Sequence, residues 1–296
     1  MMAELFKTLK RQSSFTLVLL VSIGGFVLFS SFGKPTAGKT SFNLAAEEKS
    51  WMEPFFRGIM LQHNAIYTLY GSKPMTIVSI DINEEVQGDD SQRSKQEKKK
   101  RIIFENYHLL QNWENWEKVK ARFHVNRYAF FKKADIANPD QAIIYFADMT
   151  KIALTLQENY DLFKRETGLD FDPLSESLSL EQGSKFWTEV FDNSALLGML
   201  LGYGIKNSFC FQWKYGDLSD IHEKLAESLL FRFSDKPQGG KATFDKLSLP
   251  IFASFSEGED EVIEKYKRER EMIRSVYENK DFLNMTLQKL TQVDQQ

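Results

Sequence analysis

The chain is 296 residues long, with 42% hydrophobic and 14% aromatic residues, so it has ample apolar material for a folded core and is not a disordered chain. Its net charge is −3, and this mildly acidic balance argues against general nucleic-acid binding, which needs a basic face to neutralise phosphates. The single cysteine, Cys210, excludes an internal disulfide, so packing must supply the stability of the fold.

The N-terminal residues 1–33 predict a membrane anchor or signal segment. Residues 15–32 form an uncharged apolar run, and Lys7, Lys10 and Arg11 precede it. The run is at the lower edge of what crosses a hydrocarbon core of about 30 Å, and the basic residues favour a cytoplasmic N-terminus. We therefore expect a single-pass protein of a bacterial inner membrane, with its body outside the cytoplasm.

Two other interpretations of this segment stay open. A cleaved signal peptide is the first, because residues 31–33 offer a small-x-small cleavage site, and the body would then be exported. A buried N-terminal helix of a soluble protein is the second, although basic residues followed by such a long uncharged run disfavour it.

A phosphate-loop pattern, G-x-x-x-x-G-K-[ST], follows directly at residues 33–40. In that interpretation Gly33 and Gly38 let the backbone wrap the phosphates, Lys39 reaches them, and Thr40 holds Mg²⁺. Such a loop needs a buried strand before it, whereas residues 28–32 are the tail of the longer apolar run. We favour a linker over residues 34–50. A membrane-tethered nucleotide hydrolase that uses residues 33–40 is the alternative function.

The first half of the expected body, residues 51–296, mixes helices and strands. A helix over 51–70 would carry Pro54 in its first turn and end at Gly71. Four further segments follow in chain order: a buried strand over 75–82, a charged loop over 83–101, a helix over 102–119 and a strand over 123–131.

The second half begins with a strand over 142–146 and a helix over 150–167, capped by Thr150 and stopped by Gly168. Residues 193–204 predict a tightly packed core helix, with a ligand-contacting loop as the alternative. The remaining segments are a helix over 181–191, an aromatic strand over 207–213, a strand over 249–255, and helices over 258–279 and 281–290. Without a strict βαβ rhythm, these elements predict a single α+β domain.

Signals of catalytic or metal chemistry are missing from the sequence. None of the four histidines has a second histidine three or four residues away, and neither H-E-x-x-H nor G-x-S-x-G occurs. Cys210 lies in an apolar segment, which is typical of an inert thiol. We expect no catalytic residue, no metal site and no cofactor, and whether the protein is an enzyme stays open.

Two strings, residues 68–74 (TLYGSKP) and residues 200–207 (LLGYGIKN), resemble strings in membrane-anchored proteins of chlamydia-related bacteria. The resemblance covers only these stretches and the N-terminal segment. It implies a bacterial exported protein, and it brings no activity and no site residues.

The sequence as a whole therefore predicts an extracytoplasmic protein that is membrane-anchored or secreted, with a binding or envelope-structural role. The expected partners are the membrane, through the N-terminal segment, and a protein of the envelope, but not nucleic acid.

Overall fold

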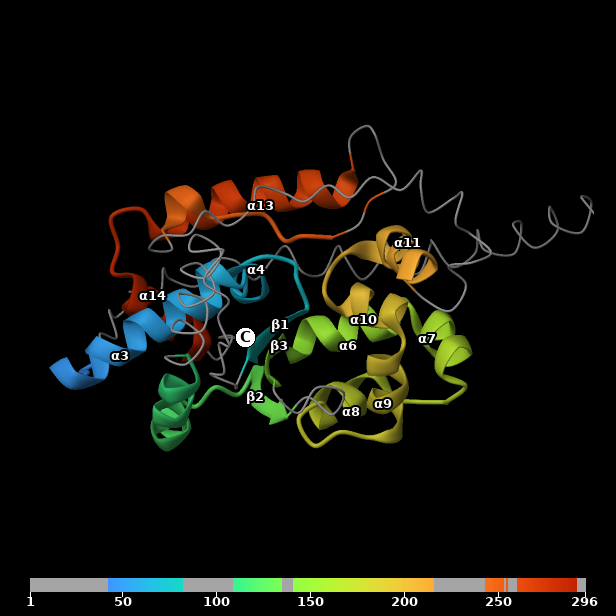
Figure 1. The fold of residues 1–296 in the computed structure, drawn as a ribbon, viewed down its shortest axis with the longest axis horizontal. Coiled ribbons are helices and arrows are strands. Elements are labelled where there is room, and N and C mark those ends of the chain that lie inside the picture. The colour runs from blue at the N-terminus through green and yellow to red at the C-terminus, as the bar shows by residue number, and fades with distance from the viewer. Residues whose placement is uncertain are drawn as a thin grey trace, which may run out of the picture. The chain divides into compact units, whose positions relative to one another are not determined.

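Helices and one small antiparallel sheet make up the computed structural model, which describes residues 42–81, 109–134, 141–215, 243–252, 254 and 260–291. The predicted α+β class is confirmed (Figure 1). The first half contains α3 (Ala46–Arg57), the π-helix η2 (Gly58–Gln62), α4 (Ile66–Leu69), β1 (Met75–Asp81), a helix over 109–119, the 3-10 turn η4 (Lys120–Phe123), β2 (Tyr128–Ala134) and β3 (Gln141–Asp148).

The second half is helical. It contains α6 (Met149–Glu158), α7 (Tyr160–Thr167), α8 (Pro173–Ser179), α9 (Lys185–Asp192), α10 (Ser194–Leu200), α11 (Gly204–Tyr215), the 3-10 turn η5 (Phe244–Lys246), α13 (Glu261–Tyr277) and α14 (Phe282–Thr291). Within the described ranges, no helix has both the length and the apolar character needed to cross a membrane. The expected segment 1–33, the phosphate-loop pattern and the charged loop 83–101 lie outside the described residues.

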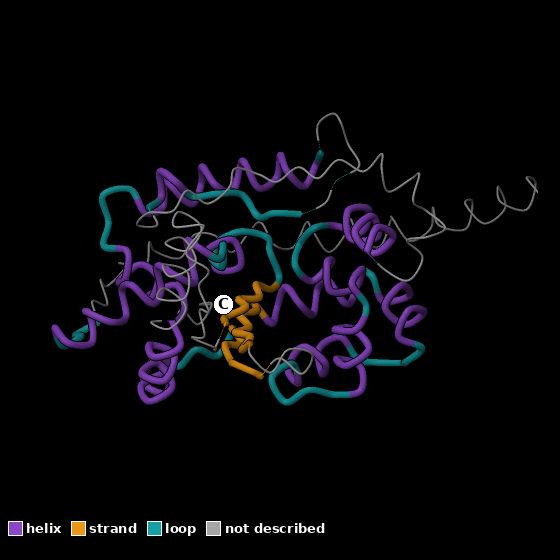
Figure 2. Tube along the Cα trace, in the orientation of Figure 1, coloured by secondary structure: helices purple, strands orange, loops and turns teal. Residues whose placement is uncertain are grey.

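The sheet has the strand order β1-β3-β2, and both pairs are antiparallel. The central strand β3 is apolar along most of its length because its two faces are both covered (Figure 2). In the register, Phe146 of β3 lies opposite Thr76 of β1 and Phe130 of β2. The predicted strands over 75–82 and 142–146 are confirmed, and the third strand lies further along the chain than the expected 123–131.

Alternating side chains of the sheet supply two separate cores. Val78, Phe130 and Phe146 point to the first, which also contains residues of α3, η2, α4, the helix 109–119, α13 and α14. Met75 and Tyr145 point to the second, which contains residues of α6, α7, α9 and α10 and Leu180, directly after α8. The period of two along a strand therefore divides the body into a layer of helices on each face of the sheet.

A buried charge network fixes the end of β3. Asp148 has no exposed surface, and its carboxylate accepts hydrogen bonds from Arg127 (2.9 Å to Nη2) and from the backbone N–H of Lys151 (3.2 Å). The Nζ of Lys151 lies 3.2 Å from the same carboxylate and also donates to the carbonyl of Thr68 in α4. Asp148 therefore caps α6 and links it to Arg127, and Lys151 links the same carboxylate to α4.

The predicted helix over 51–70 is wrong in its start and its continuity. The helix begins at Ala46, because Glu48 reaches back to accept the N–H of Ala45 at 3.1 Å. Pro54 therefore lies inside α3 rather than in its first turn. After the π-helix the chain breaks at Asn64, which has a positive φ of 60°, and α4 is a separate short helix.

The helix predicted over 150–167 is two helices. The cap is the carboxylate of Asp148 rather than Thr150, and Asn159 separates α6 from α7 because its side chain donates to the carbonyl of Thr155 at 2.8 Å. The stop at Gly168 is confirmed by its φ of 68°. The helix predicted over 181–191 is confirmed as α9, which begins at Lys185.

The strand predicted over 207–213 is wrong, because these residues belong to the helix α11. Asn207 and Cys210 are buried whereas Phe211 and Trp213 are exposed, which is a helical rather than an alternating pattern. Packing of α11 against α10 overrides the β-propensity of the aromatic residues. The core helix predicted within 193–204 is confirmed as α10.

The C-terminal predictions differ in outcome. The described part of 249–255 contains no strand. The helix predicted over 258–279 is confirmed as α13, which Asp260 caps by accepting the N–H of Val262 at 2.9 Å. The last helix is confirmed as α14.

Candidate functional site

The structure does not test the sequence-predicted candidates for a site. Gly33, Gly38, Lys39 and Thr40 lie outside the described residues. Across the described ranges, no group of three or more His, Cys, Asp or Glu side chains is arranged to hold a metal ion. Cys210 is buried in α11, and burial raises the pKa of its thiol to about 11, so it stays protonated at neutral pH.

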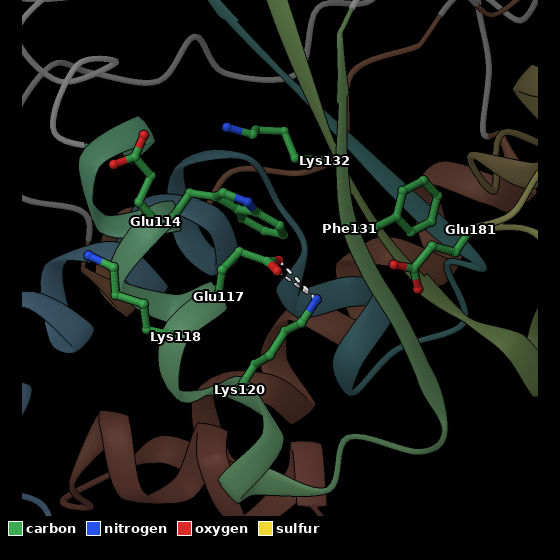
Figure 3. A pocket seen from close by; sticks show the side chains of 8 residues that line it. Glu114, Glu117, Lys118, Lys120, Phe131, Lys132 and Glu181 are labelled. Carbon is green, nitrogen blue, oxygen red and sulfur yellow. Dashed lines mark hydrogen bonds and ion pairs between the residues drawn. The ribbon is translucent and has the colours of Figure 1, made fainter.

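A groove of about 640 Å³ lies between the helix 109–119 and the edge strand β2. Figure 3 shows how the strand divides it, with Phe131 and Glu181 on one side and Lys132 and the helix on the other. Sequence analysis missed this groove, because its lining residues come from three distant segments.

The two aromatic residues that line the groove, Trp113 and Phe131, are each packed against another ring. Trp113 packs edge-on against Phe130 with ring centroids 4.9 Å apart, and Phe131 stacks on Tyr145 of the central strand, also at 4.9 Å. These rings belong to opposite faces of the sheet, because neighbouring residues of β2 alternate between the two cores. The groove therefore runs over the edge of the sheet rather than into one of its faces.

The rim of the groove carries charges of both signs. Glu117 forms an ion pair with Lys120, with 2.8 Å between Oε2 and Nζ. Four further lining side chains are exposed and form no ion pair with any residue of the described ranges: Glu114, Lys118, Lys132 and Glu181. Two unpaired acids and two unpaired bases suit an occupant that itself carries both kinds of charge.

The strand at the groove, β2, is an edge strand among the described strands. Among the described strands, β2 has only β3 beside it, so the donors and acceptors of its outer edge meet no other described strand. The exposed residues of β2 are Lys132 and Ala134 near its end, and Lys132 on an edge is a common protection against unwanted strand pairing. An extended backbone laid in the groove would meet both the strand edge and the charged rim.

No known protein family, curated protein or solved structure matches this chain.

Proposed function

We propose that this chain is an extracytoplasmic binding protein, held at a bacterial inner membrane by its N-terminal segment or exported after cleavage of that segment. Its body binds an extended segment of an envelope protein in the groove beside β2. The observation that carries the proposal is that the outer edge of β2, which no other described strand pairs with, borders a groove whose lining acids and bases without a described ion-pair partner are equal in number.

An extended peptide is the occupant that the groove favours. Addition of a strand to an exposed sheet edge gives affinity through backbone hydrogen bonds, and pockets on either side select alternate side chains. Here one set of side chains would face Phe131 and Glu181, and the other set would face Trp113 and Lys132. A nucleic acid would not suit the groove, because binding phosphates needs an excess of positive side chains. Among the lining side chains without a described ion-pair partner, the glutamates and lysines are equal in number.

Selection of peptides tests the binding function. A library of ten-residue peptides is displayed and selected against the full chain in detergent, and the selected peptides are then measured by calorimetry. Bound peptide should slow hydrogen exchange of the β2 amides, residues 128–134. Reversing one exposed rim charge, as in Lys132→Glu, should change the affinity about threefold to tenfold.

The matched control is Lys280→Glu, since Lys280 is exposed and lies outside the groove lining. It should leave the affinity unchanged. If no peptide is selected, or if the selected peptides bind both variants equally and do not protect β2, the groove is not a peptide site and the proposed binding function is rejected.

A reporter tests the location of the body. Alkaline phosphatase fused after Gln296 should be active in a bacterial host, because it folds only outside the cytoplasm, and the full chain should sediment with membranes unless its signal is cleaved. Deletion of residues 1–33 should abolish both the reporter activity and the membrane association. An inactive reporter on a chain that stays in the cytosol would reject the extracytoplasmic location while leaving the peptide experiment unaffected.

A further inference from the structure

Successive residues of β2 alternate between turning their backbone groups towards β3 and turning them away. The N–H of Met149 donates to the carbonyl of Arg127 at 3.1 Å, and these two residues continue the register that pairs Phe131 with Tyr145. In an antiparallel ladder, a hydrogen-bonded pair recurs at every second residue. The odd-numbered residues of β2 therefore bond to β3, and the even-numbered residues turn their N–H and C=O groups outward.

The pairing of β1 with β3 gives the same assignment. The N–H of Asp148 donates to the carbonyl of Pro74 at 2.9 Å, in line with the register of these two strands. The even-numbered residues of β3 therefore bond to β1, which leaves its odd-numbered residues for β2. Lys132 is an outward-facing residue that also lines the groove, and within the described ranges no residue forms a hydrogen bond with its N–H or C=O.

The side chain of Lys132 lies on the side of the sheet that the helix 109–119 covers. Phe130 points to the first core, and Trp113 packs edge-on against it. Lys132 is two residues further along the strand, so it shares that side (Figure 3). A residue of an added strand that lies directly opposite Lys132 would also have its side chain on the helix side.

The groove is more positive on the helix side than on the other side. Of the lining charges without a described ion-pair partner, Glu114, Lys118 and Lys132 lie on the helix side, and Glu181 lies on the other (Figure 3). Two bases and one acid give the helix side an excess of one positive charge. Lys132 is exposed at the strand edge itself. An acidic side chain directly opposite Lys132 is therefore the cross-strand neighbour that this side favours.

We propose that the partner segment adds to β2 as an antiparallel strand and places an acidic residue directly opposite Lys132. This inference rests on the peptide-binding function proposed above. Antiparallel pairing is the more stable per residue, and it continues the pattern of the described sheet. In this arrangement the acidic residue and the residues two positions from it turn their N–H groups towards β2. The residues between them turn theirs away.

Charge exchange tests the acidic position. Each acidic residue of the tightest-binding ten-residue peptide from the selection is replaced by lysine in turn, and calorimetry measures the affinity for the full chain. One replacement should weaken binding about threefold to tenfold, and the Lys132→Glu variant should restore most of the affinity for that peptide alone.

The matched control is Lys133→Glu. Lys133 is the next residue of β2, but its side chain lies on the other side of the sheet, with Nζ 5.2 Å from the centroid of the Phe131 ring. This variant should restore none of the lost affinity. Circular dichroism of both variants checks that they are folded.

N-methylation of the peptide tests the direction of the added strand on the unaltered chain, so it does not depend on the folding of a variant. A methyl group on the amide nitrogen of the acidic residue, or of a residue two positions away, should weaken binding at least about fivefold, because a hydrogen bond to β2 is lost. Methylation of the residue next to the acid should be tolerated. Parallel addition would reverse this pattern.

The inference is overturned if the selected peptides protect β2 from hydrogen exchange but lack an acidic residue, if Lys132→Glu rescues no position or Lys133→Glu rescues equally, or if methylation follows the parallel pattern. Peptide binding beside β2 would then stand, and only the assigned register and charge would be wrong. If no peptide is selected at all, the proposed binding function is rejected together with this inference.

Discussion

Gly198 of α10 lies so close to Ser208 of α11 that a Cβ at Gly198 would be 2.7 Å from Oγ and 3.0 Å from Cβ of Ser208. The Ser208 hydroxyl is held in place because it donates to the carbonyl of Gly204 at 2.7 Å. The backbone of α10 at Gly198 therefore lies directly against the Ser208 side chain of α11, and both residues are buried. The small residue at position 198 sets how closely they approach.

Replacing Gly198 by Leu should overpack this contact and lower the free energy of unfolding by about 1–3 kcal/mol or more. Urea unfolding measures the change. A milder Gly198→Ala variant should be partly rescued by Ser208→Gly, because the second change removes the atoms that the new Cβ meets. An unchanged or raised midpoint in Gly198→Leu would show that the two helices do not pack in this way.

Lys73 should make stability depend on pH. Its pKa is about 7 in the folded protein and 10.5 as the ordinary value, so between these limits the unfolded chain binds the proton that the folded chain releases. Raising the pH from 7 towards 10 should therefore increase the free energy of unfolding, by up to about 1.4 kcal/mol per pH unit from this group.

The Lys73→Met variant lacks this contribution, so it should be more stable than the wild type at pH 7, and the difference should shrink as the pH rises towards 10. Urea unfolding at pH 7, 8 and 9 gives the two curves. Parallel curves would contradict the lowered pKa of Lys73.

Asp148→Asn should be strongly destabilising, by about 3–5 kcal/mol, because Arg127 and Lys151 would be left as buried or half-buried cations without their shared carboxylate. The matched control is Asp161→Asn in α7, where the side chain is exposed and the cost should stay within about 0.5 kcal/mol. Thermal melts of both variants decide the point. If the two variants have equal melting temperatures, the ion-pair network around Asp148 contributes little to the stability of the fold.

Lys39→Ala should not affect nucleotide binding, because the phosphate-loop pattern follows a poor candidate for a buried strand. A fluorescent ATP analogue titrated into the full chain measures this, and Lys34→Ala is the control for the loss of a nearby positive charge. ATP affinity that disappears in Lys39→Ala but survives in Lys34→Ala would favour the nucleotide hydrolase instead.

Elements with several agreeing local signals could be predicted from the sequence. For α13, an acidic residue at the cap and a regular apolar stripe coincide, and β1 and β3 are short apolar runs of the right length. Asp172 and Pro173 are the cap and the first residue of α8, and Asp172 accepts the N–H of Ser175 at 2.7 Å. This helix-start signal is local, so the start of α8 could also be predicted from the sequence.

The groove and the buried lysine could not be predicted in the same way. Trp113, Lys132 and Glu181 become neighbours only because β2 takes the edge position in a sheet ordered β1-β3-β2. Lys73 follows a glycine and a serine and precedes a proline, which is typical of an exposed turn. In the structure Lys73 is buried and lies against Gly202, where a Cβ would be 3.3 Å from Cα of Lys73. Nothing in the sequence near Lys73 specifies this approach.

The two cores of the body differ in how much of the chain each requires. The residues of the second core run from Met75 to Leu200, whereas those of the first run from Met52 to Leu290 and bring α3 against α14. During synthesis, the second core can close as soon as residue 200 has emerged, while the first must wait for α14. A chain exported during or after translation would therefore keep the aromatic face of the sheet uncovered longest, and that face is where a chaperone would be needed.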